Sequence, residues 1–249
     1  MRSAVIFCLA MLIFTACGQP PVRILITTGG HDYEEGPFWA MFDEMEGITY
    51  EAISLPENAD MLKPGLQKNY DVILMYDMVD SIEVEHQQAF VNLLNEGIGL
   101  VSMHHNLGAH RHWDEFTRII GGKYVFEERV LEGSTYPPST FHHDMEIPVT
   151  VVDKSHPVTR GLTDFTIHDE TYKGYYKASD VRVLLTSDHS LSDPPLCWIQ
   201  QYGKSPVCYI LFGHDSKAWR HSAFSKLVRN AIIWAANGGN SRKILPDTE

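Results

Sequence analysis

Short apolar segments alternate with amphipathic segments along the first half of the chain. The apolar segments are rich in β-branched residues and have the length of buried strands; they cover residues 23–28, 49–55, 71–76 and 99–103. The segments between and after them show helical spacing of apolar residues; they cover residues 37–45, 83–95 and 113–120. Strands that alternate with helices in this way predict parallel βαβ units with right-handed crossovers.

The pattern changes after Gly121-Gly122, which we expect to end the third helix. Residues 123–176 hold short β-like pieces, at 148–153 and 165–167, between loops that contain proline and histidine. Further strands are expected at 181–186, 196–201 and 207–212, followed by a closing helix at 224–237. We predict one α/β domain over residues 22–239, a mostly parallel sheet flanked by helices with an inserted antiparallel β excursion, and a loose tail at 240–249.

The N-terminal segment has the order of a secretory signal: Arg2, an apolar run at residues 4–14, then small residues. The run is shorter than the roughly 20 apolar residues that a membrane-spanning helix needs. Phe14-Thr15-Ala16-Cys17 resembles a bacterial lipoprotein box, although phenylalanine stands where leucine is usual. We therefore predict a signal peptide at residues 1–16, lipidation of Cys17, and an extracytoplasmic protein anchored to a bacterial membrane, in the periplasm or at the cell surface.

Composition narrows the class of protein. The chain has 249 residues, of which 44% are hydrophobic, enough for one substantial core. Its net charge of -12 argues against nucleic acid as a partner, because phosphate binding requires a basic surface. The oligomeric state stays open, with a homo-oligomer as one option. Cys197 and Cys208 flank an expected hairpin whose turn at Gly203-Lys204 places them diagonally, so a disulfide and two buried thiols both remain open.

Histidines follow three of the predicted strands at the point where each strand ends. They occur in the segments Gly29-Gly30-His31-Asp32, Met103-His104-His105-Asn106 and Gly213-His214-Asp215. The carboxyl ends of parallel strands meet at one edge of a sheet, where ligands bind. Neutral imidazoles bind divalent transition metals, and a carboxylate often completes such a site. The segment His168-Asp169-Glu170-Thr171-Tyr172, after the strand-like 165–167, is the best source of that carboxylate.

Other interpretations of these residues remain open. Because His104 and His105 are adjacent, we expect one to ligate and the other to pack or to bond to the loop. Asp32 and Asp215 either orient the neighbouring histidines or occupy turns at strand ends. His110 and His112 are expected at the surface or as helix caps, and His142-His143 as a lid contact. Aromatic rings near the same edge suit a sugar ligand, although core packing is favoured for Trp39 and Trp113.

Several motifs of well-known enzymes are absent. The sequence has no Gly-x-Ser-x-Gly elbow, no glycine-rich phosphate loop and no Gly-x-Gly-x-x-Gly fingerprint. The sequence therefore lacks the usual motifs for serine hydrolysis, nucleotide hydrolysis and dinucleotide binding.

Five sequence blocks in this order resemble the trehalose-utilisation (ThuA-like) family. The blocks are 29–33, 99–105 with 113–116 and 121–122, 156–162, 169–172, and 213–215, and the resemblance runs from about residue 23 to residue 237. It implies a flavodoxin-like sheet similar to class I glutamine amidotransferases. It also implies a role in the catabolism of trehalose and related keto-sugars, and a zinc-like ion as cofactor.

The resemblance also implies residue roles. By position it places the divalent metal, expected to be zinc, on His31, His105, His214 and Glu170. It implies catalytic roles for Glu170, His104, Asp169 and Tyr172. We expect the sugar to contact Asp32, Tyr33, Trp113 and Asp215. The amidotransferase nucleophile would be a cysteine after the strand 100–103, where this chain has His104, so amide hydrolysis is not expected. Gly203-Lys204-Ser205-Pro206 replaces a common Gly-Arg turn, which puts any anion contact from that hairpin in doubt.

Two functions from different classes follow. The first is a metal-assisted isomerase, lyase or hydrolase that acts on a sugar or keto-glycoside. The alternative is a non-catalytic sugar-binding lipoprotein, in which the histidines and aromatic rings only hold the ligand. A scaffold that has kept the fold and lost the site is a third option.

Overall fold

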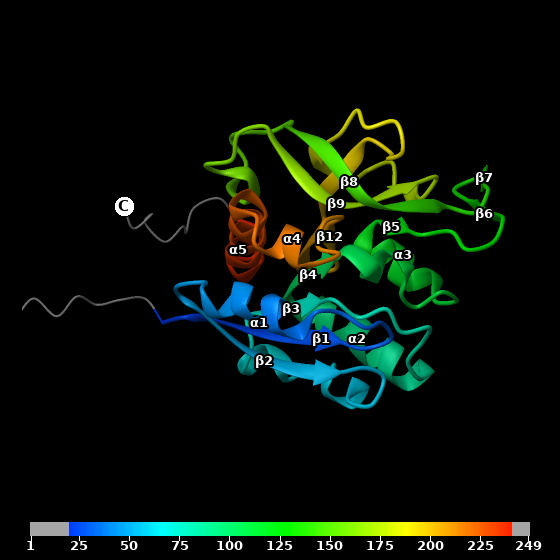
Figure 1. Cartoon of the computed structure of the whole chain (residues 1–249). Helices are drawn as coiled ribbons and strands as arrows, with labels where there is room; N and C mark the ends of the chain where they lie inside the picture. The colour runs from blue at the N-terminus through cyan, green and yellow to red at the C-terminus, as the bar shows by residue number, and fades with distance from the viewer. Residues whose placement is uncertain (1–19, 241–249) are drawn as a thin grey trace, which may run out of the picture.

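The carboxyl edge of a parallel sheet is the feature of the fold that positions the candidate site. The structure, a computed structural model, describes residues 20–240. The predicted signal peptide, Cys17 and the tail after residue 240 lie outside the described residues. Within them, a nine-stranded sheet has the order β2-β1-β3-β4-β13-β12-β11-β8-β9 (Figure 1).

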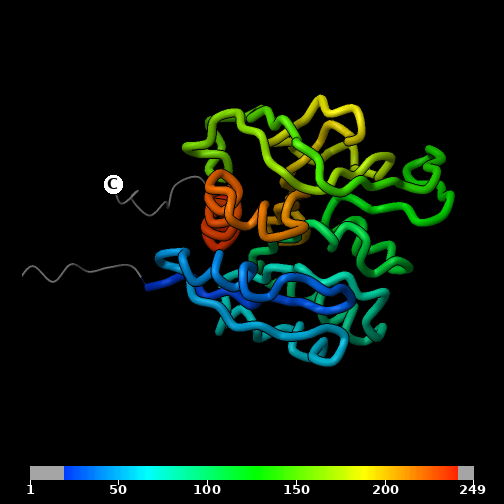
Figure 2. Tube along the Cα trace, viewed as in Figure 1, coloured from blue at the N-terminus to red at the C-terminus, as the bar shows by residue number. Residues whose placement is uncertain are grey.

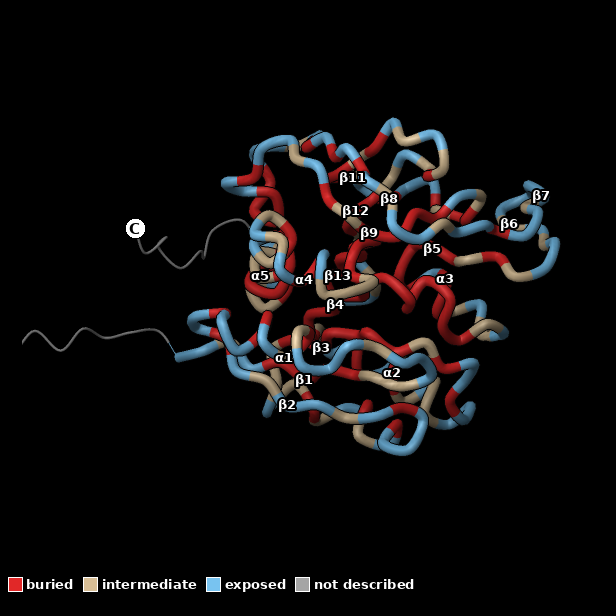
Figure 3. The backbone as a smooth tube through the Cα atoms, in the orientation of Figure 1, coloured by how far each residue is buried: buried red, intermediate tan, exposed pale blue. Residues whose placement is uncertain are grey.

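The first five strands of that order are parallel. They are β2 (Ile48–Ser54), β1 (Val22–Thr28), β3 (Val72–Met75), β4 (Gly99–Met103) and β13 (Ser205–Ile210). Every residue of β3, β4 and β13 is buried, because both faces of this part of the sheet are covered. Figure 3 shows this buried centre in red, with the exposed residues of β2 at its edge. The continuous apolar runs in the sequence reflect this burial.

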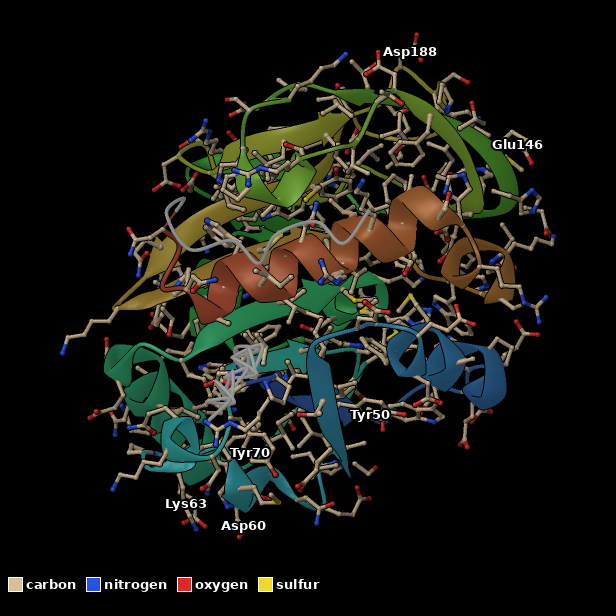
Figure 4. The ribbon with its side chains drawn as sticks, turned by 90° about the vertical axis from the view of Figure 1, so that its left-hand side faces the viewer. Tyr50, Asp60, Lys63, Tyr70, Glu146 and Asp188 are labelled. Atoms are coloured by element: carbon tan, nitrogen blue, oxygen red, sulfur yellow. The ribbon has the colours of Figure 1, made fainter. Side chains whose placement is uncertain are left out.

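Helices connect the parallel strands and cover them. They are α1 (Glu35–Asp43), α2 (Val84–Glu96), α3 (Asp114–Ile120), the short α4 (Ser216–Trp219) and α5 (Ser222–Ala236). Helix α5 contacts β3, β4 and β13, and a Cβ at Gly99 would lie 2.7 Å from the backbone carbon of Ala235, so glycine permits this close packing. At the sheet edge, Tyr50 of β2 stacks on Trp39 of α1 and donates to Asp43 (2.7 Å), which confirms packing for Trp39 (Figure 4).

The remaining four strands of the sheet form the antiparallel excursion. They are β12 (Pro195–Tyr202), β11 (Arg182–Thr186), β8 (Thr140–Val151) and β9 (Phe165–Lys173). Figure 2 shows the excursion above the parallel half, with both ends of the described chain on one side of the molecule. Strands β8 and β9 are longer than predicted, so residues 168–172 lie inside β9 and not after a strand. Much of β8 is exposed, so it lacks the apolar run that would have marked it as a strand.

Smaller elements complete the described chain. They are the strands β5 (Gly122–Lys123), β6 (Arg129–Leu131), β7 (Ser134–Tyr136) and β10 (Tyr176–Lys177), and the 3-10 turns η1 (Ala59–Met61), η2 (Leu66–Lys68), η3 (His104–Gly108) and η4 (Pro157–Thr159). Among the described helices, none combines the length and apolar character needed to cross a membrane. The predicted fold class, a mostly parallel α/β sheet with an antiparallel extension, is confirmed.

The two cysteines of the β12–β13 hairpin are free and buried. Cys197 lies opposite Ile210 and Cys208 opposite Ile199, so the cysteines are diagonal neighbours, as the turn at Gly203 predicts. Their sulfur atoms are 3.9 Å apart, well beyond the roughly 2.05 Å of a disulfide.

Candidate functional site

The turn η3 after β4 presents two histidines at the carboxyl edge of the sheet. His104 has a φ of +46°, in the left-handed region that residues other than glycine rarely adopt. Buried hydrogen bonds hold this turn: Tyr209 donates its hydroxyl to the His104 carbonyl oxygen (2.9 Å), and Ser102 donates to the Asn106 side chain (2.7 Å). The sharp change of direction directly after the strand brings the imidazoles of both His104 and His105 into the site.

Histidines from two strand ends meet a carboxylate from β9. Nε2 of His104 lies 3.2 Å from Oε2 of Glu170 and 3.3 Å from Nδ1 of His214. The distance from that His214 nitrogen to Oε2 of Glu170 is 3.5 Å. Ligand atoms of a tetrahedral zinc ion with bonds of 2.0–2.1 Å stand about 3.3 Å apart. These three side chains therefore have the spacing of three corners of a zinc site.

His105 supplies a fourth donor. One donor atom from each of His104, His105, Glu170 and His214 can be chosen so that all four lie within 4.8 Å of one another. His105 is 5% exposed, and its Nδ1 is buried with no hydrogen-bond partner within the described residues. Burial, reinforced by the charges of neighbouring histidines, holds the pKa of His105 well below its usual value. The neutral imidazole is the form that binds a metal, so His105 is suited to a divalent ion, whereas His104, whose pKa is raised, must lose its proton when an ion binds.

His104 and Glu170 stabilise each other's charged forms. Burial alone raises the pKa of Glu170, but the hydrogen bond and charge of His104 outweigh it and lower the pKa overall. Burial likewise lowers the pKa of His104, but its bond to Glu170 and the charge of Asp169 outweigh it and raise the pKa overall. Glu170, 4% exposed, is thus held as a carboxylate inside the protein, as a metal ligand must be.

Asp169 holds the backbone of the site in place. Its Oδ2 accepts the N–H of Gly213 (2.7 Å), and its Oδ1 accepts the N–H groups of Glu170 (2.7 Å) and His214 (3.1 Å). The side chain is buried, and all three contacts are to backbone. Asp169 therefore connects β9 to the loop after β13, and it fixes the distance between Glu170 and His214.

A cavity of about 220 Å³ opens onto three of the four donors, His105, Glu170 and His214. Aromatic and apolar side chains form much of its wall; the lining residues are His31, Met78, His105, Gly108, Tyr124, Phe126, Phe141, His143, Glu170, Tyr172 and His214. Phe141 is half exposed at the rim, and the hydroxyl of Tyr172 lies 3.2 Å from Nε2 of His104. The cavity thus joins an apolar wall to a polar floor, which suits a small ligand with both kinds of surface.

The imidazoles after β1, β4 and β13 converge, as the topology predicts. His31 stacks on His105 with ring centroids 4.0 Å apart, and His105 lies 5.6 Å from the ring of His214. His31 is nevertheless exposed, and its Nδ1 bonds to the Asp32 carbonyl oxygen (2.6 Å). The four-donor group contains His104, which we expected to be catalytic, and leaves out His31, which we expected as a ligand.

The four residues expected to contact a sugar lie outside the cavity lining given above. Asp32 is exposed, and Trp113 stacks on Phe116 of α3, in agreement with the packing role favoured for it. Tyr33 makes edge contacts with surrounding aromatic rings, among them Phe38. The carboxylate of Asp215 caps α4 by accepting N–H groups of its first turn, which favours the turn role left open for it.

His143 of β8, which the sequence suggested as a lid contact, is a direct neighbour of the donor group. Its Nδ1 lies 3.3 Å from Oε1 of Glu170, the oxygen that does not face His104, and its ring centroid is 4.7 Å from that of His214. The expectation of a lid contact agrees with this exposed position at the cavity. Strand β8 could not be aligned with Glu170 from sequence, because its length and register were not predicted.

The expectation that His110 is a surface or capping residue is wrong. His110 is fully buried with φ +50°, and its Nε2 lies 3.5 Å from Oδ2 of Asp77, which is also fully buried. Burial raises the pKa of Asp77 to about 6 and lowers that of His110 to about 3. Asp77 also accepts the hydroxyl of Thr27 (2.6 Å), and its carbonyl oxygen accepts from the Asn106 side chain (2.9 Å). The Asp77–His110 pair therefore helps to hold the turn η3 in place, through the hydrogen bond between Asp77 and Asn106.

Comparisons with known proteins agree with the fold and the sequence blocks. The model of a family described as trehalose utilisation, ThuA, matches residues 23–235. A thua-like protein from Parabacteroides merdae is similar in structure, with a TM-score of 0.73 and 20% identity over 91% of this chain and 94% of that one. A thua-like protein from Bacteroides uniformis has a TM-score of 0.63 and 20% identity, over 88% of this chain and 93% of that one. No curated protein matches the sequence. At these identities the structural likeness shows the fold alone.

Proposed function

Because the chain belongs to the trehalose-utilisation (ThuA) family, whose model covers residues 23–235, its role is carbohydrate-related, and we propose that it is a metal-assisted enzyme of sugar catabolism. The reaction we propose is isomerisation, elimination or hydrolysis of a sugar or keto-glycoside. The observation that carries the proposal is the spacing of the donors: three atoms from His104, His214 and Glu170 stand 3.2–3.5 Å apart, and Glu170 and His214 also line a cavity.

We assign His104, His105, His214 and Glu170 as the residues that hold the ion, which we expect to be zinc. When bound, a divalent ion polarises a carbonyl or hydroxyl oxygen and lowers the pKa of a bound water. The protein's own groups account for proton movement. His143 contacts Oε1 of Glu170 and faces the cavity, so it is placed to pass a proton between this carboxylate and a ligand.

The cavity wall supports a sugar as the ligand. A pyranose ring presents C–H faces that pack against aromatic rings and hydroxyl groups that need polar partners. Tyr124, Phe126 and Phe141 supply the first kind of surface, and the imidazoles with Glu170 supply the second. A cysteine nucleophile is missing at the turn after β4, where His104 stands, so the amidotransferase reaction of similar folds is not part of the proposal.

We also propose an extracytoplasmic location with the chain anchored through a lipid on Cys17. The support is the order of residues before Cys17, which resembles a lipoprotein signal. Mass spectrometry of the protein from a bacterial membrane fraction would test it: an acylated N-terminal Cys17 is expected, and an intact segment 1–16 would contradict it.

The enzymatic proposal is tested by incubating zinc-loaded protein with oxidised and unoxidised glucosides and identifying the products by mass spectrometry. We expect turnover by the wild type and none by Glu170→Gln, in which one carboxylate oxygen facing the histidines is replaced. His86→Ala is the matched control, because His86 lies on α2 and outside both the donor group and the cavity. Saturable binding without turnover would contradict the enzyme and favour the sugar-binding lipoprotein.

A further inference from the structure

A second cavity lies beside the first and is lined largely by charged residues. Its volume is about 330 Å³, and it is lined by Arg111, His112, Lys123, Val125, Phe126, Glu127, Glu128 and Arg129. These residues come from the approach to α3 and from the segment between β5 and β6, on the side of the molecule where Figure 1 labels those elements. Phe126 also lines the first cavity, so one aromatic ring borders both.

Lys123 is the unusual residue of this cavity. It is only 5% exposed, whereas lysines are rarely this buried unless they are paired. Within residues 20–240, its ammonium group has no hydrogen bond and no carboxylate at ion-pairing distance. Its backbone is held in β5, where Lys123 pairs with Tyr176 of β10. The Lys123 side chain is therefore largely buried, and its ammonium group faces the cavity without a direct carboxylate partner.

The pKa of Lys123 is consistent with this environment. Burial, together with the charge of Arg129, lowers the pKa to about 8, against the opposite effect of the Asp114 carboxylate. At neutral pH most molecules still carry the ammonium charge, since the pKa stays above 7. A buried cation of this kind is stabilised by an anion that comes into the cavity.

The two arginines of the cavity are already fixed. Arg111 lies 3.9 Å over the ring of Phe126, and its Nε is 2.8 Å from Asp80. Arg129 forms an ion pair with Asp114 and donates to the Arg111 carbonyl oxygen (3.2 Å). Neither Asp80 nor Asp114 lies at ion-pairing distance from Lys123, although the charge of Asp114 acts to raise the pKa of Lys123, and the cavity-lining residues Glu127 and Glu128 are exposed to solvent. Arg129 therefore adds positive potential at Lys123 from a position that is held in place, and this effect exceeds the opposite effect of Asp114.

We propose that this cavity binds an oxyanion, either a carboxylate or a phosphate group, with the Lys123 ammonium as its principal contact. Such a contact is a charge-assisted hydrogen bond, stronger than a bond between neutral groups. The anionic group belongs either to a free anion or to an acidic sugar whose ring lies beyond Phe126.

Calorimetric titration of the full-length, metal-free protein with inorganic phosphate and with glucuronate tests the proposal. We expect saturable binding of at least one of them, weakened about tenfold or more in Lys123→Met, because hydrogen bonds to charged groups contribute this much. Lys123→Arg should retain binding. Lys177→Met is the matched control: Lys177 lies on the paired strand β10 and its ammonium bonds to the Ala178 carbonyl oxygen.

Tighter binding of glucuronate than of phosphate would identify an acidic sugar as the ligand, and the reverse would identify a free anion. Anion binding should persist in Glu170→Gln, so the proposed anion site and the proposed metal centre can be tested independently of each other. Absence of binding by both anions, or equal affinity in Lys123→Met and the wild type, would overturn the proposal. Should Lys123→Met fail to fold, competition by increasing chloride supplies the second measurement: affinity that is unchanged from low to high salt would also overturn it.

Discussion

Replacing Asp169 by asparagine should damage both the stability of the fold and the geometry of the site. The carboxylate accepts one backbone N–H on Oδ2 and two on Oδ1. An amide has one accepting oxygen, so its NH₂ group must face the N–H of Gly213 or those of Glu170 and His214. At least one buried N–H is then unpaired in either orientation of the amide.

The size of the effect follows from these contacts. An unpaired buried donor costs about 1–3 kcal/mol, and the remaining bonds lose their charge assistance, so we expect a total loss of roughly 2–4 kcal/mol. For a chain of this size that corresponds to a fall in Tm of roughly 5–15 °C. Because the loop that carries His214 is no longer held against Glu170, zinc affinity should also fall about 10- to 100-fold.

Differential scanning calorimetry and zinc titration of Asp169→Asn measure the two effects. Asp164→Asn is the matched control, because Asp164 also accepts a backbone N–H, from Val151 (3.0 Å), but is exposed. Its Tm should change little. A Tm of Asp169→Asn equal to that of the control, with unchanged zinc affinity, would refute the positioning role of Asp169.

Two further predictions concern residues around the site. A Cβ at Gly30 (φ +75°) would lie 2.4 Å from the Met78 backbone, so Gly30→Ala should lower the stability by about 2 kcal/mol or more, measured by urea denaturation; a loss below 0.5 kcal/mol would contradict this. The raised pKa of Asp77 (about 6) makes stability fall as pH rises from 4 to 6, whereas the lowered pKa of His110 (about 3) makes it rise, so the two offset. In Asp77→Asn only the His110 effect remains, and stability should rise with pH by about 1.4 kcal/mol per unit relative to the wild type; parallel Tm profiles would contradict this.

The parallel half of the fold was predictable because its strands are buried on both faces. Such strands appear in sequence as continuous apolar runs, and the predicted limits of β4 (residues 99–103) agree with the structure. The antiparallel half was predicted only in outline. The first half of β8 is largely exposed and polar, β9 buries the polar residues Asp169, Glu170 and Thr171, and a register shift between His142 and Met145 interrupts the pairing of the two strands.

The candidate site was predictable as far as topology determines it. The rule for strand ends identified the regions of His31, His104-His105 and His214, and their rings do meet. The left-handed turn at His104 determines which imidazoles form the four-donor group. No sequence pattern predicted that turn. The contact of His143 with Glu170 depends on the pairing of β8 with β9. No sequence pattern indicated that pairing, so the contact could not be predicted.

The most direct test of the account is the metal content and coordination of the purified protein after loading with zinc, manganese or nickel. We predict one ion per chain by elemental mass spectrometry. For zinc, X-ray absorption should show ligands near 2.0–2.1 Å dominated by imidazole nitrogen, with the ion lost in the double variant His105→Ala/His214→Ala. A content well below one ion per chain for all three metals, or equal content in the double variant, would contradict a metal centre built from these residues.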